Sequence, residues 1–193
     1  ITVDNGGKYE LYVRCEDANG NSNAANFVFK FCISEGPDTT PPLIMGTSIL
    51  NNQPFSYGQK STNIELYVNE PSECRWSHTD KSYELMEENM TCSTSVSEIN
   101  TQMSYTCRGN LTGLKDGQNN QFYFKCKDQP HLKGTKESER NSNTQSHPLN
   151  LVGTRPLVIE SAGPNGIIED SADVIKINLE VKTTAGHDEG RAI

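Results

Sequence analysis

Hydrophobic and polar residues alternate in short runs along most of this chain, and Asn, Gly, Pro or Asp stand at the ends of the runs. Alternation with a period of two places the apolar side chains on one face of an extended strand. Several such strands within one domain length are typical of a β-sandwich. The pattern therefore predicts an all-β chain, with strands near residues 43–50, 62–69, 73–77, 103–109, 120–127 and 146–152.

One alternating run occurs twice, which indicates an internal repeat. Residues 9–17 read Tyr-Glu-Leu-Tyr-Val-Arg-Cys-Glu-Asp, and residues 120–128 read Asn-Gln-Phe-Tyr-Phe-Lys-Cys-Lys-Asp. The two cysteines, Cys15 and Cys126, lie 111 positions apart, which is the length of a domain. A polar turn, a second alternating run and a junction with proline follow each copy. The repeat predicts tandem domains of one fold.

The register of the repeat predicts where these domains begin and end. We expect the C-terminal part of one domain at residues 1–39, a complete domain at 40–154 and the N-terminal part of a third at 155–193. The junction at 36–42 is rich in proline, which restricts its own backbone and that of the residue before it, so a stiff linker is expected there. Because the two partial units together are shorter than one repeat, the chain is expected to be a section of a longer array.

One stretch of the middle domain departs from the alternating pattern. From Asp80 to Asn89 the spacing of apolar residues is helical. Tyr83, Met86 and the following Met90 occupy positions i, i+3 and i+7. Asp80 is a favourable residue for the N-cap of a helix. We therefore expect one short helix in the complete domain, packed over the edge of the sandwich.

Acidic residues exceed basic ones, and the formal net charge is −8 at neutral pH. A protein that binds nucleic acid needs a concentration of basic residues, so this balance argues against a nucleic-acid partner. No apolar run approaches the length of a membrane-spanning helix, so no membrane span is expected in this chain.

Six cysteines are dispersed along the chain, and none lies in a C-x-x-C pair. Dispersed cysteines in an acidic, strand-rich chain suggest disulfides and an oxidising, extracellular location. The middle domain holds four of them, at positions 74, 92, 107 and 126, and four cysteines allow three pairings. A zinc site formed by Cys74, His78, Cys92 and Cys107 is an alternative, but this spacing matches no zinc-finger pattern.

Several motifs of the middle domain together resemble a known module. They are Cys74-Arg75-Trp76-Ser77, then Asp80, Tyr83, Met86 and Met90, then Leu114 with Gly117, and finally Phe122-Tyr123-Phe124-Lys125-Cys126 with Asp128. In this combination the chain resembles the tandem Ig/fibronectin-III-like β-sandwich modules of large bacterial and archaeal cell-surface proteins. The likeness covers the middle domain fully and the two flanking pieces in part, and it carries little information about activity.

The resemblance also implies which cysteines are joined. It pairs Cys74 with Cys126, which leaves Cys92 and Cys107 as the second disulfide of the domain. Cys15 is then expected to pair with a cysteine outside this chain, upstream of Ile1. The repeat gives Cys32 no cysteine counterpart in the middle domain, so it is expected to be unpaired or bonded outside the chain.

Candidate catalytic and metal-binding groups are scarce. Ser77, His78 and Asp80 are the residue types of a catalytic triad, but triad members normally converge from separate segments. We therefore predict no catalytic residue and no enzyme activity. A calcium hypothesis uses Asp17 and Asp38 at the junction between domains, although the Glu that ends an EF-hand loop is missing. No other cofactor is expected.

Two further features concern sugars. Asn89 and Asn110 begin Asn-x-Thr sequons, which permit N-glycosylation outside the cytoplasm. Trp76 and Tyr83 are candidates for a platform on which a bound sugar stacks, whereas a Trp at this place in a sandwich is more often part of the core.

Together these features predict a structural module of an extracellular cell-surface array, such as a filament, a stalk or a surface layer. The expected partners are copies of the chain itself or neighbouring domains of the same array, with cell-surface glycans as a further candidate. The alternative function is an adhesin or a carbohydrate-binding accessory module of a secreted protein.

Overall fold

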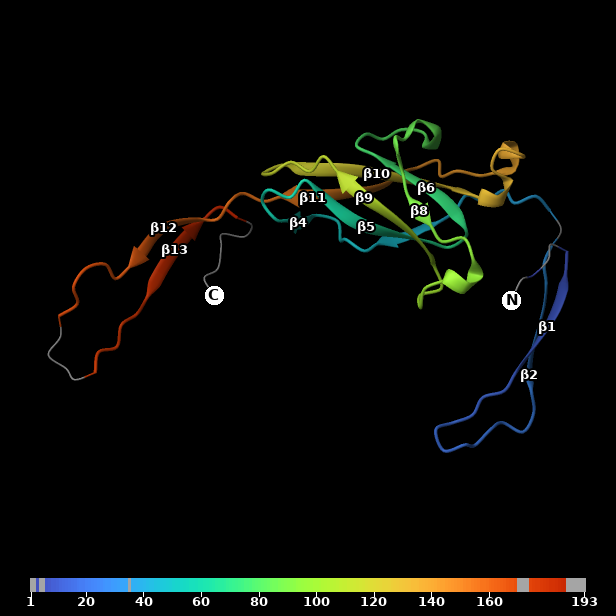
Figure 1. The fold of residues 1–193 in the computed structure, drawn as a ribbon. Coiled ribbons are helices and arrows are strands. Elements are labelled where there is room, and N and C mark those ends of the chain that lie inside the picture. The colour runs from blue at the N-terminus through green and yellow to red at the C-terminus, as the bar shows by residue number, and fades with distance from the viewer. Residues whose placement is uncertain (1–2, 4–5, 35, 170–173, 187–193) are drawn as a thin grey trace. The chain divides into compact units, whose positions relative to one another are not determined.

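A computed structural model describes residues 3, 6–34, 36–169 and 174–186 (Figure 1). The chain forms two compact units, Ile1–Thr40 and Pro41–Ile193. The strands of the described residues are two to ten residues long, and the helical segments there are short 3₁₀ turns. None of these turns is long and apolar enough to cross a membrane. The chain is therefore an all-β protein with several sheets, as the alternating sequence predicts.

The first unit contains one antiparallel hairpin. Strand β1 (Lys8–Val13) pairs with β2 (Phe27–Cys32), so that Val13 lies opposite Phe27 and Lys8 lies opposite Cys32. The alternation puts Tyr9, Leu11 and Val13 of β1 on one face with Phe27, Phe29 and Phe31 of β2, while Tyr12 and Val28 lie on the other face.

The middle part of the chain contains a four-stranded antiparallel sheet. It consists of β3 (Ile44–Thr47), β5 (Ser61–Val68), β9 (Tyr105–Thr112) and β8 (Thr91–Cys92), in this spatial order. Polar and apolar residues alternate along β5. Its residues Ile64, Leu66 and Val68 all point to the same side, where they are buried.

The other strands of this region form a five-stranded sheet that shares a core with the four-stranded one. Its spatial order is β4 (Gln53–Phe55), β11 (His147–Gly153), β10 (Asn119–Asp128), β6 (Ser72–Ser77) and β7 (Glu88–Asn89). The β4–β11 pair is parallel and the other pairs are antiparallel. Strand β10, the longest, therefore lies at the centre of the sheet.

One hydrophobic core receives side chains from both sheets. From the five-stranded sheet come Trp76, Phe122 and Phe124, each at most 2% exposed, and from the four-stranded sheet come Ile64 and Leu66. Ring contacts within the core include Trp76 against Phe122, with ring centroids 5.4 Å apart. The core fills one face of each sheet, while the outer faces carry polar residues.

After this core the chain forms another antiparallel pair, β12 (Val158–Gly163) with β13 (Glu180–Thr184). A register shift between Ile159 and Ser161 interrupts the ladder. The rest of the predicted third domain, at 170–173 and 187–193, lies outside the described residues.

All six strands predicted from the alternation are present in the middle of the chain, with ends that differ by a few residues. The sequence did not predict β4, β7 and β8, because strands of two or three residues are too short to show a period.

The predicted helix between Asp80 and Asn89 is wrong. The structure has only a 3₁₀ turn, η1 (Tyr83–Leu85), and then β7, whose Glu88 pairs with Trp76. Several glutamates would lie three or four residues apart on such a helix, and their repulsion disfavours it. Asp80 does not cap a helix, because its carboxylate accepts a hydrogen bond of 2.6 Å from the Ser146 hydroxyl.

The shared core predicts a sharp contrast between two substitutions. Phe124→Ala removes a fully buried ring and should lower the free energy of unfolding by about 3–5 kcal/mol. Leu85→Ala, at a side chain that is 67% exposed, should change it by less than about 0.5 kcal/mol. Urea unfolding followed by tryptophan fluorescence measures both. Equal effects of the two substitutions would contradict the described core.

Candidate functional site

Two disulfides hold residues 41–154 of the second unit, called the middle unit below, together, one in each of its two sheets. Cys74 on β6 is joined to Cys126 on β10, and the two residues are direct cross-strand partners. Cys92 on β8 is joined to Cys107 on β9, again as direct cross-strand partners. Each bond therefore fastens two neighbouring strands of the same sheet.

The two disulfides touch each other in the core. The Sγ atom of Cys107 lies 3.4 Å from the Sγ atom of Cys74, and both residues are buried. Sulfur atoms in disulfides carry no hydrogen, so this contact is one of close packing. The contact links the four-stranded sheet to the five-stranded sheet at the point where a disulfide joins two strands of each sheet.

The zinc alternative uses some of the same sulfurs. The Sγ atoms of Cys74, Cys92 and Cys107 lie within 4.8 Å of one another. Zinc binds cysteine as the thiolate, and a sulfur in a disulfide is not one. His78 does not join these sulfurs as a zinc ligand, because its ring packs against the rings of Trp76 and Phe122. The arrangement is that of a disulfide core.

The same set of hydrogen bonds holds the connection of two hairpins, β10–β11 and β1–β2. We call this set, formed by an Asp, two Asn and a Cys, the hairpin closure. In the first, the carboxylate of Asp128 accepts bonds from the backbone N–H and the side-chain amide of Asn141, at 2.6 and 2.8 Å. In the second, the carboxylate of Asp17 accepts from the same two groups of Asn21, each at 2.9 Å. Backbone bonds complete each closure.

A cysteine is held in both closures. The Oδ1 atom of Asn143 accepts a hydrogen bond of 2.8 Å from the N–H of Cys126, and Asn23 does the same for Cys15 at 2.6 Å. The backbone N–H of each asparagine returns a bond to the carbonyl of its cysteine. The repeat found in the sequence is therefore repeated in the hydrogen bonds, and Cys15 occupies the position of Cys126.

Sequence reasoning noted the polar turns of the two copies but did not assign this closure. The signal was present, because an Asp two residues after the cysteine is followed in each copy by Asn-Ser-Asn, at 21–23 and 141–143. Aspartate and asparagine side chains commonly bond nearby backbone groups in this way. The number of residues between the two motifs differs, and this difference hides the match.

In the middle unit the longer connection between β10 and β11 carries an ion network. Arg140, whose side chain is 2% exposed, donates to the Glu73 carboxylate at 2.8 Å and to the backbone carbonyl of Asp128 at 2.8 Å. Glu137 pairs with the same guanidinium group at 3.2 Å. A buried arginine held by several acceptors ties the connection back to β6 and β10.

The carboxylates of this network have lowered pKa values. Burial alone would raise the pKa of Glu73, but ion pairs with Lys133 and Arg140 outweigh it and lower the pKa. The ammonium group of Lys127, 2.9 Å from the carboxylate, and the N–H of Gly134 lower the pKa of Glu137 to about 2. Both groups are therefore ionised in the folded protein at neutral pH.

Cys15 and Cys32 are exposed and are not part of a disulfide in this structure. Cys15 follows the end of β1 at Val13, and Cys32 lies opposite Lys8 at the other end of the hairpin. The hairpin therefore separates the two thiols along its length, and the pair cannot form an unstrained disulfide with each other.

The calcium hypothesis pairs Asp17 with Asp38, and the structure gives the two carboxylates different partners. Asp17 accepts three hydrogen bonds from Asn19 and Asn21, and the bonds from Asn21 chiefly lower its pKa. Asp38 accepts bonds from the backbone N–H and the hydroxyl of Thr40. The two residues follow opposite ends of the β1–β2 hairpin.

The residues that imitate a catalytic triad do not converge. The hydroxyl of Ser77 donates to the carbonyl of Thr79 at 2.6 Å, and Asp80 accepts from Ser146. The ring of His78 contacts aromatic rings of the core. The three side chains thus serve a turn and the core.

The two rings proposed for sugar stacking are buried. Trp76 is 2% exposed and Tyr83 is 5% exposed, and the guanidinium group of Arg75 covers the Tyr83 ring at 4.9 Å. A polar hollow near the β9–β10 turn has a lining rich in amides; it consists of His78, Gly113, Lys115, Gln118, Asn119, Asn120 and Gln121. Both sequon residues, Asn89 and Asn110, are exposed.

Comparisons with models of known protein families, with curated proteins and with solved structures found no match. The function of the chain is therefore inferred from its own residues and their geometry. The features that carry this inference are the disulfide core and the repeated hairpin closure.

The disulfide in the four-stranded sheet should make a large contribution to stability. The double substitution Cys92→Ala with Cys107→Ala opens a link across 15 residues and should lower the free energy of unfolding by about 3 kcal/mol. Cys15→Ala, at an exposed thiol, is the control and should change it by less than about 0.5 kcal/mol. Urea unfolding without reductant measures both. An unchanged midpoint for the double variant would exclude a stabilising disulfide.

The ion network predicts a specific change in titration. Lys127→Met keeps the length of the side chain and removes its charge, so the pKa of Glu137 should rise from about 2 toward its ordinary value. Lys136→Met, which removes the partner of Glu139, should leave the pKa of Glu137 unchanged. Carboxyl NMR signals followed during an acid titration measure this.

The sign of the effect on stability follows from the lowered pKa. A carboxylate whose pKa is lower in the folded than in the unfolded state stabilises the fold above its ordinary pKa. That contribution is lost as the pH falls from about 4.5 to about 2. Lys127→Met should therefore weaken the acid dependence of unfolding in this range, and an unaltered acid profile would argue against the ion pair.

Proposed function

We propose that residues 40–154 form an Ig/fibronectin-III-like β-sandwich. Strands β3, β5, β6, β8, β9, β10 and β11, lettered A to G in chain order, give the sheets A-B-E-D and G-F-C. This is the strand order of the seven-stranded Ig fold. Strand β4 extends the G edge and β7 extends the C edge. The core shared by the two sheets supports the same assignment.

The disulfides distinguish this module from an antibody domain. In antibody domains a disulfide joins strands B and F, which lie in different sheets, and a Trp on strand C packs against it. Here Cys74–Cys126 joins the strands in positions C and F of one sheet, and Leu66 on β5 fills core space in position B. The link between the sheets is the packing contact between the two disulfides.

We infer that the chain is a structural module of an extracellular cell-surface array. The observation that carries this proposal is the hairpin closure around Cys15, whose hydrogen bonds between the Asp, the two Asn and the Cys match those around Cys126. Two copies of one module in tandem are the arrangement of a rod built from repeated domains. The disulfides support an oxidising location, and the extracellular surface is the location that suits such a rod.

The structure also suggests how one module could be held to the next. The last proline of the linker, Pro42, is buried in the middle unit, and its carbonyl accepts a hydrogen bond from the side chain of Asn143. The same asparagine holds Cys126. The entry point of the chain into the module is thereby tied to the disulfide-bonded strand, so that tension on the linker reaches a covalently closed sheet.

The alternative function, an adhesin or a carbohydrate-binding accessory module, has less support. Sugar-binding sites commonly use exposed aromatic faces, and Trp76 and Tyr83 are buried. The polar hollow near β9 and β10 offers amides without such a face.

Immunoelectron microscopy of unfixed native material tests the proposed function. An antibody against residues 40–154 should label fibres or a lattice at regular intervals along their length, since each subunit of an array carries the module. Label confined to contact zones between cells would contradict the array and favour the adhesin. An antibody against the cytoplasmic content of the same cells is the control for leakage.

A further inference from the structure

Strand β1 pairs with β2 along one of its two edges. Among the described residues it pairs with β2 alone. Its counterpart in the repeat, β10, is paired on both sides, with β11 and with β6. An open strand edge of this kind presents backbone groups to which another strand can be added.

When Cys15 is aligned with Cys126, the cross-strand pairs of the β1–β2 hairpin match those of the β10–β11 hairpin, so their faces can be compared. Leu11 lies opposite Phe29 in the first unit, where Phe122 lies opposite Leu149 in the middle unit. Continuing the alternation, Cys15 falls on the same face as Leu11, just as Cys126 falls on the face of Phe122. Cys32 falls on the opposite face, which it shares with Lys8, Glu10, Tyr12, Val28 and Lys30.

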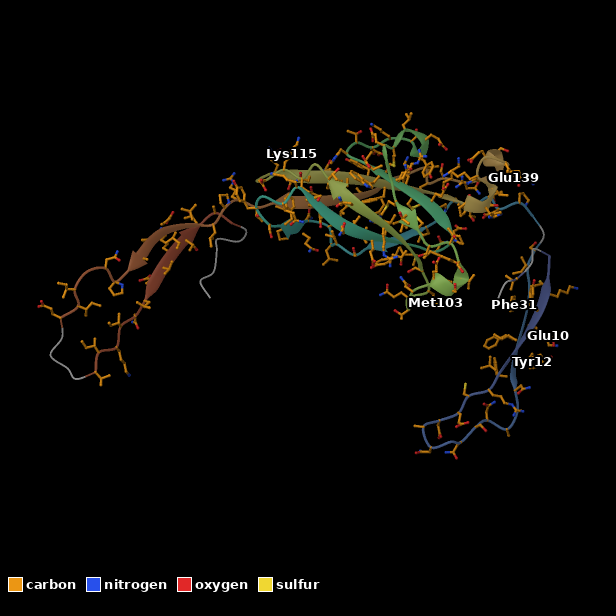
Figure 2. The ribbon with its side chains drawn as sticks, in the orientation of Figure 1. Glu10, Tyr12, Phe31, Met103, Lys115 and Glu139 are labelled. Atoms are coloured by element: carbon orange, nitrogen blue, oxygen red, sulfur yellow. A yellow bond between two sulfur atoms is a disulfide. The ribbon has the colours of Figure 1, made fainter. Side chains whose placement is uncertain are left out.

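The equivalent faces differ sharply in exposure. In the middle unit Phe122 and Leu149 are at most 1% exposed. In the first unit Tyr9 and Val13 of that face are half-buried, and the other four side chains are 42–64% exposed, namely Leu11, Phe27, Phe29 and Phe31. The apolar face of the first unit, to which Phe31 in Figure 2 belongs, is therefore more exposed than its counterpart in the middle unit.

We propose that the open edge of β1 is the docking site of a cysteine-bearing strand of the β6 type, closed by a disulfide to Cys15. In the middle unit β6 adds antiparallel to β10 and places Cys74 directly opposite Cys126. The hydrogen bonds that hold Cys126 also hold Cys15. The occupant has the pattern Ser-x-Cys-x-aromatic-Ser, which sets its aromatic side chain against the apolar face.

Charge refines the identity of this strand. In the middle unit Lys127 lies opposite Glu73 of β6. Glu16 takes the place of Lys127 in the first unit, and like charges directly opposite each other destabilise a strand pair. The strand that docks on β1 is therefore expected to carry Lys or Arg where β6 carries Glu73.

This inference rests on the proposed function, in which modules of one kind are joined in an array, and it is tested separately. The probe is a synthetic peptide of residues 71–80 with the substitution Glu73→Lys, its cysteine carried as a mixed disulfide with glutathione. The thiolate of Cys15 attacks the peptide sulfur, so that a disulfide forms between them. The bond to glutathione breaks, and the glutathione thiolate leaves and takes up a proton.

The 193-residue chain is mixed with a small excess of this peptide, and the products are mapped by mass spectrometry without reduction. The peptide should join Cys15 at least about tenfold faster than Cys32, because several cross-strand pairs act together. A shuffled peptide with its cysteine in the same place is the matched control and should show no such preference. The unsubstituted Glu73 peptide should react more slowly than the Glu73→Lys peptide.

Two variants of the chain sharpen the result. Cys32→Ser should leave the reaction unchanged, while Leu11→Asp, which places a charge on the apolar face, should remove the preference for the β6-like sequence without removing the thiol. Equal reaction at both cysteines, equal rates for the shuffled peptide, or Cys15–Cys15 dimers as the main product would overturn the docking site. None of these outcomes alters the labelling pattern expected in native material, so the two proposals fail separately.

Discussion

The packing contact between two disulfides is the constraint on which the middle unit depends. The Sγ atoms of Cys74 and Cys107 are 3.4 Å apart. A disulfide therefore joins two strands of each sheet at the point where the sheets meet. The domain has few large apolar residues, so a hydrophobic core of this size leaves a small margin of stability. Cross-links that restrict the unfolded chain then supply a large share of it.

The second organising element is the hydrogen-bonded closure beside the cysteine. Asp128 and Asn141 close the end of the hairpin, and Asn143 connects Cys126 with the carbonyl of Pro42. The buried Asp128 carboxylate and the half-buried asparagines thereby find hydrogen-bond partners, which favours a single arrangement. The closure therefore joins the disulfide-bonded strand to the point where the linker enters, and matching hydrogen bonds are found around Cys15.

Much of the fold could be predicted from the sequence, because strands of five or more residues impose a visible alternation. The runs ending at Val68 and Cys126 are examples, and their apolar positions are the buried ones. The helix at residues 80–89 was wrong because the spacing of Tyr83, Met86 and Met90 fits burial in an irregular segment equally well. The segment forms strand β7, which pairs with β6, and no local sequence pattern indicates such pairing.

The candidate site was harder to predict, for a related reason. Arg140 and Glu73 form their ion pair across 67 positions of sequence, and the connection that brings them together has no period of its own. The cysteines allowed three pairings, and the resemblance to surface-protein modules was needed to choose one. The burial of Trp76, by contrast, follows from its place in an alternating strand.

The most direct test of this account is a disulfide map of the protein from its native source, alkylated before extraction and digested without reduction. The account predicts one linked peptide pair that joins Cys74 to Cys126 and another that joins Cys92 to Cys107. Alkylated thiols at these four positions would contradict it, because the core would then lack the covalent closure on which the rest of the module depends.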